Sequence, residues 1–285
     1  MATTFKKLSS LDKDKLMIVD ALNLAFSFRG KTKFKDAYIN MIESLKRSYK
    51  ASRVIIACDK GNSAYRQKIF PEYKQNRVEM RANQTDKERL DFETFFQEFT
   101  SAIDVIKSLS YPTTNDFCTF QFQNVEADDI AAYIVRKYKK THNIWLISSD
   151  KDWDLLIDDN VSRFSYVTRK EITKNNWEEH YEYPIDNHIS IKCLTGDSGD
   201  NIPGVDGIGP KRAAALIETY GDAYDIIASL PISSKYKYID SLNKFGAEAL
   251  LRNYKLMDLV SYCEEAIGEE NCKDIDNRLG EYLND

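Results

Sequence analysis

The chain of 285 residues is 42% hydrophobic and 30% charged, with a formal net charge of −5. This length allows one large or two modest domains with an ample core, and 17 Tyr and 14 Phe exclude an intrinsically disordered chain. No apolar run approaches the roughly 20 residues of a membrane helix, and no apolar signal-peptide core follows Lys6 and Lys7. The five scattered cysteines fit a reducing cytoplasm rather than a disulfide scaffold or a zinc site.

Three short apolar runs, each ending in an aspartate, predict buried strands. They lie at residues 16–20, 53–59 and 144–150. Continuous apolar runs of this length are typical of parallel strands that are covered on both faces. Helical periodicity between the first two, at 38–45, gives a β–α–β order. We therefore expect an α/β fold with a doubly wound parallel sheet flanked by helices, to which residues 117–123 and 163–168 add further strands.

A charged segment at about residues 70–109 interrupts this pattern. Between residues 60 and 90 there are eight Lys or Arg and four Asp or Glu, a local net charge of +4. The segment is much longer than an ordinary crossover between strands, and part of it is amphipathic. We expect a helical insertion that rises from the sheet.

The remainder of the chain, from residue 184 onward, is predicted to be all helical. Turn signals lie at 196–209, Gly221 and Pro231, and residues 258–285 hold nine acids and two bases, a net charge of −7. The expected organisation is an α/β core at 1–183 that includes the insertion, a helical region at 184–257 and an acidic C-terminal segment at 258–285.

Nine carboxylates occupy positions that the fold would bring together. Asp20, Asp59 and Asp150 each end a predicted strand, and ligands of open α/β sheets bind at the carboxyl ends of the strands. The others follow Asp150, open a predicted helix or form an i, i+3 pair in a turn: Asp152, Glu126, Asp128, Asp129, Asp197 and Asp200. Any one of them alone could simply cap a helix or end a strand. As a set they repel one another and need counter-charge.

Divalent cations would supply that counter-charge. Ligand sets made only of oxygen suit Mg²⁺ or Mn²⁺, and two such ions about 4 Å apart clamp the attacking and leaving oxygens of a phosphoryl displacement. Once the nine negative charges are set aside, the rest of the chain carries a net charge of +4. The sequence therefore favours metal-assisted phosphodiester hydrolysis of a polyanion.

A turn at residues 201–213 holds Gly204, Gly207 and Gly209. It is not a P-loop, because Gly209 is followed by Pro-Lys-Arg and no strand precedes the turn. Pro210 suits the first position of a helix, whose N-terminus, with Lys211 and Arg212, could hold a backbone phosphate. An ordinary helix connection explains the turn equally well.

Within the insertion, Tyr73 lies beside Lys74 and close to Arg77. An aromatic ring with cations suits single-stranded nucleic acid, where bases stack and phosphates pair with the charges. A solvated helix face would show the same composition, so this segment alone does not decide.

Together, these segments resemble the flap endonuclease (5′-nuclease) family, and in particular its stand-alone bacteriophage 5′→3′ exonucleases. The matching segments run in family order: 17–24, 58–61, 71–77, 125–129, 149–154, 196–201 and 207–212. One departure is Cys58, which precedes Asp59 where a small residue such as Gly is expected. No expected ligand is missing.

The resemblance implies a PIN-like 5′-nuclease core with a helical arch at about 70–109 and a helix–three-turn–helix element at the glycine turn. It implies that the nine carboxylates hold two or three Mg²⁺ ions, with Mn²⁺ as a substitute. Lys74 and Arg77 would act as catalytic residues that neutralise the scissile phosphate, and Tyr73 would stack on an unpaired base. The glycine turn, with Lys211 and Arg212, would grip duplex DNA and hold a K⁺ ion.

The implied enzyme is a magnesium-dependent 5′–3′ exodeoxyribonuclease and flap endonuclease that leaves a 5′-phosphate and a 3′-hydroxyl. Its expected partner is DNA with a 5′ flap or a 5′ single-stranded end, with RNA/DNA primer hybrids as further substrates during DNA replication. We expect a monomer in the cytoplasm, that of a bacterial host if the protein is phage-encoded, with no membrane partner. Three alternatives remain open: a PIN-type ribonuclease, a non-catalytic DNA junction-binding protein and a metal-dependent phosphatase.

Overall fold

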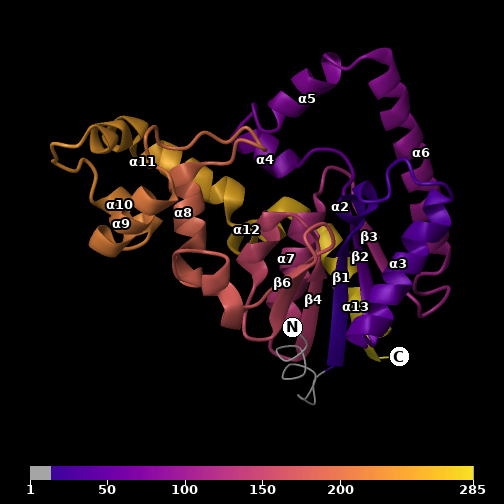
Figure 1. Cartoon of the computed structure of the whole chain (residues 1–285). Coiled ribbons are helices and arrows are strands. Elements are labelled where there is room, and N and C mark those ends of the chain that lie inside the picture. The colour runs from indigo at the N-terminus through magenta and orange to yellow at the C-terminus, as the bar shows by residue number, and fades with distance from the viewer. Residues whose placement is uncertain (1–13, 285) are drawn as a thin grey trace. The chain divides into compact units, whose positions relative to one another are not determined.

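The computed structural model describes residues 14–284, which form two compact units (Figure 1). The first unit takes the chain up to Ser63, Gln84–Lys174 and the residues from Cys263 onward; the second takes Ala64–Asn83 and Asn175–Tyr262. The segment around Lys6 and Lys7 lies outside the described residues. The units divide the chain differently from the predicted domains, because side chains far apart in sequence pack together in each; the domain boundaries at 183 and 257 stay a prediction.

A six-stranded sheet forms the centre of the first unit. Its strands are β1 (Asp14–Asp20), β2 (Arg53–Cys58), β3 (Cys118–Gln121), β4 (His142–Ile147), β5 (Val161–Ser165) and β6 (Lys170–Ile172). Their order is β3-β2-β1-β4-β5-β6, and only β6 is antiparallel to its neighbour. The predicted parallel sheet is confirmed, although residues 166–168 turn into β6 instead of extending β5. Because β1 is flanked by β2 and β4, the strand order reverses at β1, where a ligand site is expected.

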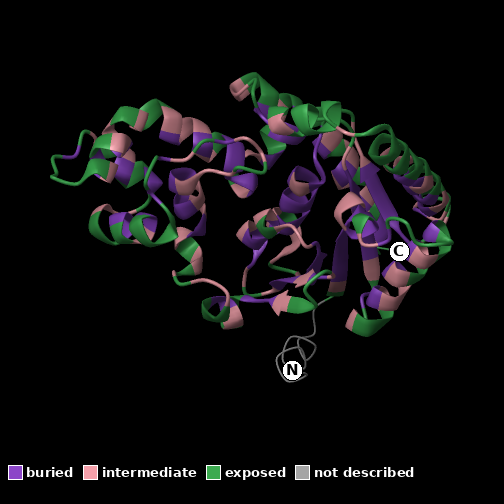
Figure 2. Cartoon of the chain, turned by 45° about the horizontal axis from the view of Figure 1, so that its top comes forward, coloured by how far each residue is buried: buried purple, intermediate pink, exposed green. Residues whose placement is uncertain are grey.

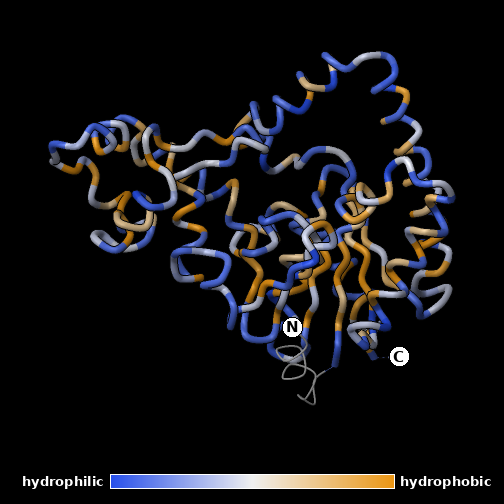
Figure 3. The backbone as a smooth tube through the Cα atoms, viewed as in Figure 1, coloured by the Kyte–Doolittle hydropathy of each residue, from blue (hydrophilic) through white to orange (hydrophobic). Residues whose placement is uncertain are grey.

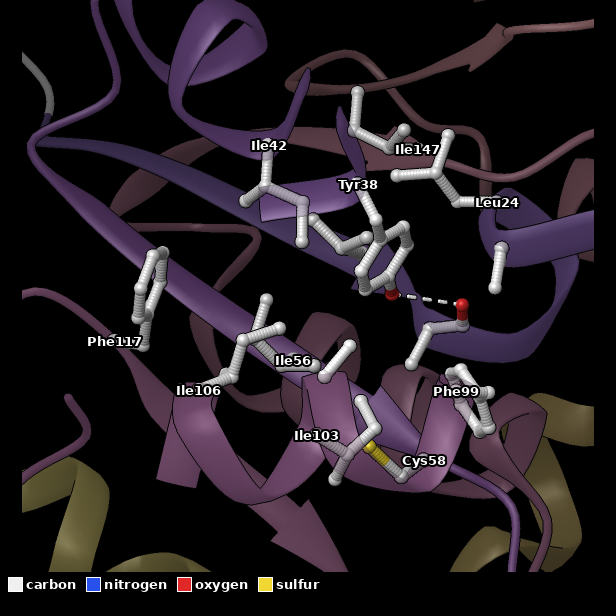
Figure 4. Close-up of a cluster of buried hydrophobic side chains, with 14 of the residues drawn as sticks. Leu24, Tyr38, Ile42, Ile56, Cys58, Phe99, Ile103, Ile106, Phe117 and Ile147 are labelled. Carbon is white, nitrogen blue, oxygen red and sulfur yellow. Dashed lines mark hydrogen bonds between the residues drawn. The ribbon is translucent and has the colours of Figure 1, made fainter. Parts of the chain in front are cut away.

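Helices cover both faces of this sheet (Figure 1). Those of the first unit are α2 (Ala21–Phe26), α3 (Phe34–Tyr49), α6 (Asp86–Ser108), α7 (Ala127–Tyr138) and α13 (Glu269–Asn284). Side chains of β1 and β2 pack with α2, α3 and α6 in the main apolar core. In that core the Tyr38 hydroxyl donates to the Ala21 carbonyl oxygen at 2.8 Å (Figure 4). The bond joins α3 to the start of α2 and so fixes the chain directly after Asp20.

The acidic C-terminal segment is part of this fold. Tyr282, on α13, is fully buried, and its hydroxyl donates to the carbonyl oxygen of Val54 in β2 at 3.2 Å. Another α13 residue, Arg278, donates to the carbonyl oxygen of Thr119 in β3 at 2.8 Å. The acids lie on the remaining surface of an amphipathic helix, so the excess of negative charge does not produce a free tail.

The second unit is built from helices, as predicted for residues from 184 onward. They are α4 (Ala64–Ile69), α5 (Gln75–Ala82), α8 (His188–Thr195), α9 (Pro210–Tyr220), α10 (Ala223–Ala228) and α11 (Lys237–Met257), with the short helices η2 (Lys174–Glu179) and η3 (Ile185–Asn187). An apolar cluster from α8 to α11 forms their core. In the chain α12 (Leu259–Ile267) then leads back to the first unit.

The insertion at 70–109 is helical, as expected, and it contributes α5 to the second unit and α6 to the first. No residue of α5 is buried (Figure 2), and most of its residues are hydrophilic (Figure 3). The start of α6 is fixed by a capping box between Thr85 and Glu88. Across residues 14–284, no helix is both long and apolar enough to cross a bilayer.

Candidate metal centre and nucleic-acid interface

Asp20 lies at the end of β1, where it also caps α2. Its side chain is 5% exposed and accepts hydrogen bonds from the Asn23 backbone N–H at 3.1 Å and from the Ser148 hydroxyl at 2.7 Å. Burial raises the pKa of Asp20 well above its ordinary value, and the nearby carboxylates of Asp59 and Asp150 raise it further. The structure thus brings the acids that end three strands within electrostatic reach of one another.

Four other predicted ligands lie around the start of α7 and the end of β2. Asp59 accepts a hydrogen bond from the Ala127 N–H, in the first turn of α7, at 2.9 Å. Glu126 is the N-cap of that helix and is buried, as is Asp129. Asp128 accepts a hydrogen bond from the Trp153 indole N–H at 2.6 Å. These contacts fix the end of β2 and the acidic turn of α7 relative to each other.

Beyond β4, Asp150 caps the short helix η1 (Lys151–Leu156) and accepts a hydrogen bond from the Asp152 N–H at 2.9 Å. The N–H of Asp150 in turn donates to the Ser148 hydroxyl oxygen at 3.0 Å. Ser148 therefore touches two predicted ligand positions, since its hydroxyl also donates to Asp20.

Among residues 14–284, no three His, Cys, Asp or Glu side chains form a group that is close enough to hold a metal ion as it stands. The donor chemistry nevertheless fits a hard divalent cation, because every candidate ligand is a carboxylate. Asp20 is a buried carboxyl with two repelling carboxylates nearby. Such a group ionises at neutral pH most readily when a cation is bound beside it.

Asp197 and Asp200 belong to the loop between α8 and α9 of the second unit. Asp197 pairs with Lys192 at 3.2 Å and accepts hydrogen bonds from the N–H groups of Gly199 and Asp200. Burial would raise the pKa of Asp197, but the Lys192 ammonium and these hydrogen bonds hold it below its ordinary value. The loop therefore keeps Asp197 ionised.

Asp200 contacts all three residues that were singled out at the base of the insertion. Arg77 Nη2 lies 2.5 Å from its Oδ1, and Lys74 Nζ lies 3.6 Å from its Oδ2. The Tyr73 hydroxyl donates to Oδ2 at 2.9 Å. The structure thus joins Tyr73, Lys74 and Arg77 to one predicted metal ligand within the second unit.

Tyr73 is buried in this structure, and its role in base stacking stays a prediction. The residue is 3% exposed and packs in an apolar cluster with Ile202 and Leu256. Its hydroxyl is bound to Asp200. Aromatic neighbours of basic residues are often buried in this way, because sequence spacing does not specify which face of a short turn points inward.

The glycine turn has a structural reason for two of its glycines. A Cβ on Gly204 would lie 2.0 Å from the Thr195 carbonyl oxygen, and Gly207 has a φ of +74°. Gly209 is the N-cap of α9, with Pro210 at the first helical position as predicted. Lys211 and Arg212 are both exposed, and Arg212 Nη1 donates to the Gly207 carbonyl oxygen at 2.6 Å. The exposed cations Lys211 and Arg212 thus lie in the first turn of α9, directly after the glycine turn.

The residues that support these acids were not predicted from the sequence. Trp153, Asp154 and Arg163 are buried, and Arg163 pairs with Asp154. The available signals were an arginine in a predicted strand and an acid next to a tryptophan. Neither identifies its partner before the strands are placed side by side.

An open parallel sheet with buried carboxylates at its strand ends, followed by a helical unit with a glycine turn, defines a PIN-like nuclease. Residues 15–182 match the 5′–3′ exonuclease N-terminal resolvase-like domain, and residues 184–277 match the 5′–3′ exonuclease C-terminal SAM fold. The chain belongs to the 5′–3′ exonuclease family. The predicted family and fold class are thereby confirmed, and so is the class of enzyme, a 5′ nuclease.

Individual relatives agree with this assignment. The flap endonuclease of Escherichia phage T5 is 44% identical over 257 residues, which cover 88% of this chain and 86% of the relative. A 5′–3′ exonuclease of Buchnera aphidicola subsp. Schizaphis graminum is 28% identical over 76% of this chain and 69% of its own length.

Solved structures of the phage T5 enzyme have the same fold. A pseudo-enzyme–product complex of the T5 flap endonuclease with DNA and metal ions aligns with a TM-score of 0.89 and 40% identity, over 95% of this chain and 100% of that one. T5 5′-exonuclease with bound zinc ions aligns with a TM-score of 0.86 and 41% identity, over 95% of this chain and 98% of that one.

Proposed function

We propose that this protein hydrolyses phosphodiesters of DNA at 5′ flaps and 5′ single-stranded ends, with Mg²⁺ as its cofactor and Mn²⁺ as a substitute. The observation that carries the proposal is the position of Asp20, a buried carboxyl at the end of β1 that is repelled by the carboxylates of Asp59 and Asp150. A hydrolase that uses divalent ions needs such a converging set of oxygens.

Two or three ions would be held by the nine carboxylates. Asp20, Asp59 and Asp150 lie at strand ends of the first unit, which also holds Asp152, Glu126, Asp128 and Asp129, whereas Asp197 and Asp200 belong to the second unit. When bound, the ions supply a water of lowered pKa and positive charge at the phosphate oxygens. Ser148 and Trp153 orient Asp20 and Asp128.

Lys74 and Arg77 would bind the scissile phosphate. In the DNA-free protein their charges are partly balanced by Asp200, so a phosphate would compete for cations that are already held in place. Charge that develops on the phosphate in the transition state is stabilised most by donors that need not reorganise. The rest of the insertion would form the arch over a 5′ single strand.

The glycine turn would bind the duplex through the backbone N–H groups around Gly204, Gly207 and Gly209 and through Lys211 and Arg212, with a K⁺ ion among the carbonyl groups. Such contacts position a duplex without identifying its bases. We place the enzyme in DNA replication, as a monomer in the host cytoplasm that removes primers, including RNA/DNA hybrids, and displaced strands.

A cleavage assay tests the proposal. A 5′-flap DNA and a matching plain duplex are incubated with the protein in Mg²⁺ or in EDTA, beside Asp150→Asn and the control Asp158→Asn. Asp158 lies in the same stretch of chain but pairs with Lys139 at 2.7 Å. We expect cleavage near the flap junction that requires Mg²⁺, is lost in Asp150→Asn and is retained in the control.

Two results would contradict the proposal. Tight flap binding without cleavage in Mg²⁺ or Mn²⁺ would make this a junction-binding protein. Preferential cleavage of RNA that lacks a duplex junction would make it a PIN-type ribonuclease.

A further inference from the structure

Arg163 in β5 and Asp154 in η1 form a buried, bidentate ion pair. Arg163 Nε lies 2.5 Å from Asp154 Oδ1, and Nη2 lies 2.9 Å from Oδ2. The two side chains are 3% and 0% exposed. A bidentate pair of this kind fixes the plane of the guanidinium group as well as its position.

Stability alone does not account for this pair. Taking two charges out of water offsets most of their attraction, and buried ion pairs can often be replaced by apolar side chains without loss of stability. An ion pair can also fix the direction of a further hydrogen bond, which a pair of apolar side chains cannot do. What the guanidinium group holds with its third nitrogen, Nη1, is therefore informative.

That donor holds the end of β4. Arg163 Nη1 donates to the Ser148 carbonyl oxygen at 2.9 Å, and the Ser148 N–H donates to the Phe164 carbonyl oxygen at 3.2 Å. Both backbone groups of Ser148 are thus bound to consecutive residues of β5. The residue lies just beyond the last residue of β4, Ile147, so these two bonds continue the attachment of the chain to β5 past the end of the strand.

The Ser148 side chain in turn contacts two of the residues predicted to bind metal. Its hydroxyl donates to Asp20 Oδ2 at 2.7 Å and accepts from the Asp150 N–H at 3.0 Å. A serine hydroxyl has one proton to donate, and here that proton goes to Asp20 while a lone pair receives the Asp150 N–H. A rotation of the Ser148 backbone would break both contacts together.

We infer that Asp154 and Arg163 are positioning residues of the nuclease site: their ion pair fixes Ser148, and Ser148 sets the orientation of Asp20 and the backbone of Asp150. The inference rests on the proposed function, since it assigns a purpose to Asp20 and Asp150 as metal ligands. Groups that orient metal ligands commonly change metal affinity or activity about 10- to 100-fold when they are removed.

The decisive variant is the double substitution Asp154→Leu with Arg163→Met. It removes both charges at once, keeps the apolar volume and leaves neither partner buried without the other. Its matched control is Asp158→Asn with Lys139→Met, which removes an ion pair in the same stretch of chain that does not contact Ser148. Ser148→Ala removes the next link alone.

Three readouts separate positioning from folding. Urea unfolding of the metal-free protein measures stability, titration of free Mn²⁺ by electron paramagnetic resonance without DNA measures metal affinity, and steady-state cleavage of the flap gives kcat and KM. For the double variant we expect an unfolding midpoint near that of the control, Mn²⁺ affinity at least tenfold weaker and kcat at least tenfold lower, with KM little changed. Adding Ser148→Ala to the double variant should cost little more, because both changes act through the same hydroxyl.

A folded double variant with wild-type Mn²⁺ affinity and kcat would overturn the inference, and so would full additivity with Ser148→Ala. If the double variant does not fold, Arg163→Lys is tested by the same readouts, because lysine keeps the positive charge but cannot form the bidentate hydrogen bonds of the guanidinium group. A third outcome separates the two proposals. If Ser148→Ala weakens Mn²⁺ binding but the wild-type protein cleaves no flap, the proposed function is refuted and the positioning role stands.

Discussion

Arg77 donates to Asp200 at 2.5 Å across 123 residues of sequence. Further hydrogen bonds join the same two segments. The Lys74 N–H donates to the Asp200 carbonyl oxygen at 2.9 Å, and the Asn76 side chain donates to the Ser198 carbonyl oxygen at 2.8 Å. The start of α5 is therefore tied to the loop that carries Asp197 and Asp200. Cations predicted to contact phosphate and acids predicted to bind metal are held by one piece of structure.

Replacing Arg77 by Ala should lower kcat for flap cleavage about 100-fold, because a preorganised donor to the transition state is lost. Arg47→Ala is the matched control, since Arg47 is an exposed arginine of α3 that pairs only loosely with Glu43, at 4.0 Å. Single-turnover cleavage measures both variants. Equal rates for the two would show that Arg77 has no part in the chemistry.

Tyr73→Phe tests whether the hydroxyl or the ring matters. The variant keeps the buried ring and loses the hydrogen bond to Asp200, so we expect a loss of about 1–2 kcal/mol in the free energy of unfolding and a several-fold drop in kcat. Urea denaturation and flap cleavage are the measurements. If Phe fully preserves activity while Leu abolishes it, base stacking by the ring is the better explanation.

The raised pKa of Asp20 makes a pH-dependent prediction for the metal-free protein. Folding favours the protonated form, so this group stabilises the fold below the ordinary pKa of 3.8, and that stability is lost as pH rises through the raised value. Asp20→Asn removes the titration, so in EDTA the stability of wild type minus that of the variant should fall as the pH rises above the ordinary pKa of 3.8.

Mg²⁺ should reverse this trend by stabilising wild type at pH 8 and not the variant. Thermal unfolding at several pH values, with EDTA or Mg²⁺, makes the comparison. If the stability of wild type minus that of Asp20→Asn rises with pH in EDTA, Asp20 is already paired with a cationic side chain.

Gly204→Ala should destabilise the second unit by about 3 kcal/mol, because its Cβ would lie 2.0 Å from the Thr195 carbonyl oxygen and the backbone must shift. Gly209→Ala is the control for stability, since a Cβ there meets nothing within 4 Å. Its free energy of unfolding should change by less than about 1 kcal/mol. Urea unfolding followed by circular dichroism distinguishes them, and equal stability would show that the turn relaxes.

Lys211→Ala should weaken duplex binding by a similar factor for all sequences and reduce the salt dependence of log K by about 1, as expected when one phosphate contact is lost. Lys273→Ala on α13 is the control, because its partner is Glu269 of the same helix at 2.6 Å. Fluorescence anisotropy over a range of salt concentrations measures both. An unchanged slope for Lys211→Ala would place the duplex elsewhere.

Sequence by itself determined the central sheet and the acids at its edge. Apolar runs at 16–20, 53–59 and 144–150 became β1, β2 and β4 because continuous burial and strand punctuation are local properties of the chain. Asp20, Asp59 and Asp150 follow from the same pattern, since parallel strands end on a common edge. Pro210 and the glycines before it likewise predicted the start of α9.

Only the tertiary structure decided what those acids touch. Ser148, Asp154 and Arg163 form a network from three segments of the chain, and no local period links an arginine in one strand to a carbonyl group in the next. Tyr73 is buried against Asp200, and α13 closes over the sheet despite its acidity, because burial depends on which surfaces meet. Local patterns specify elements, whereas hydrogen-bond partners depend on distances that exist only after the elements have packed.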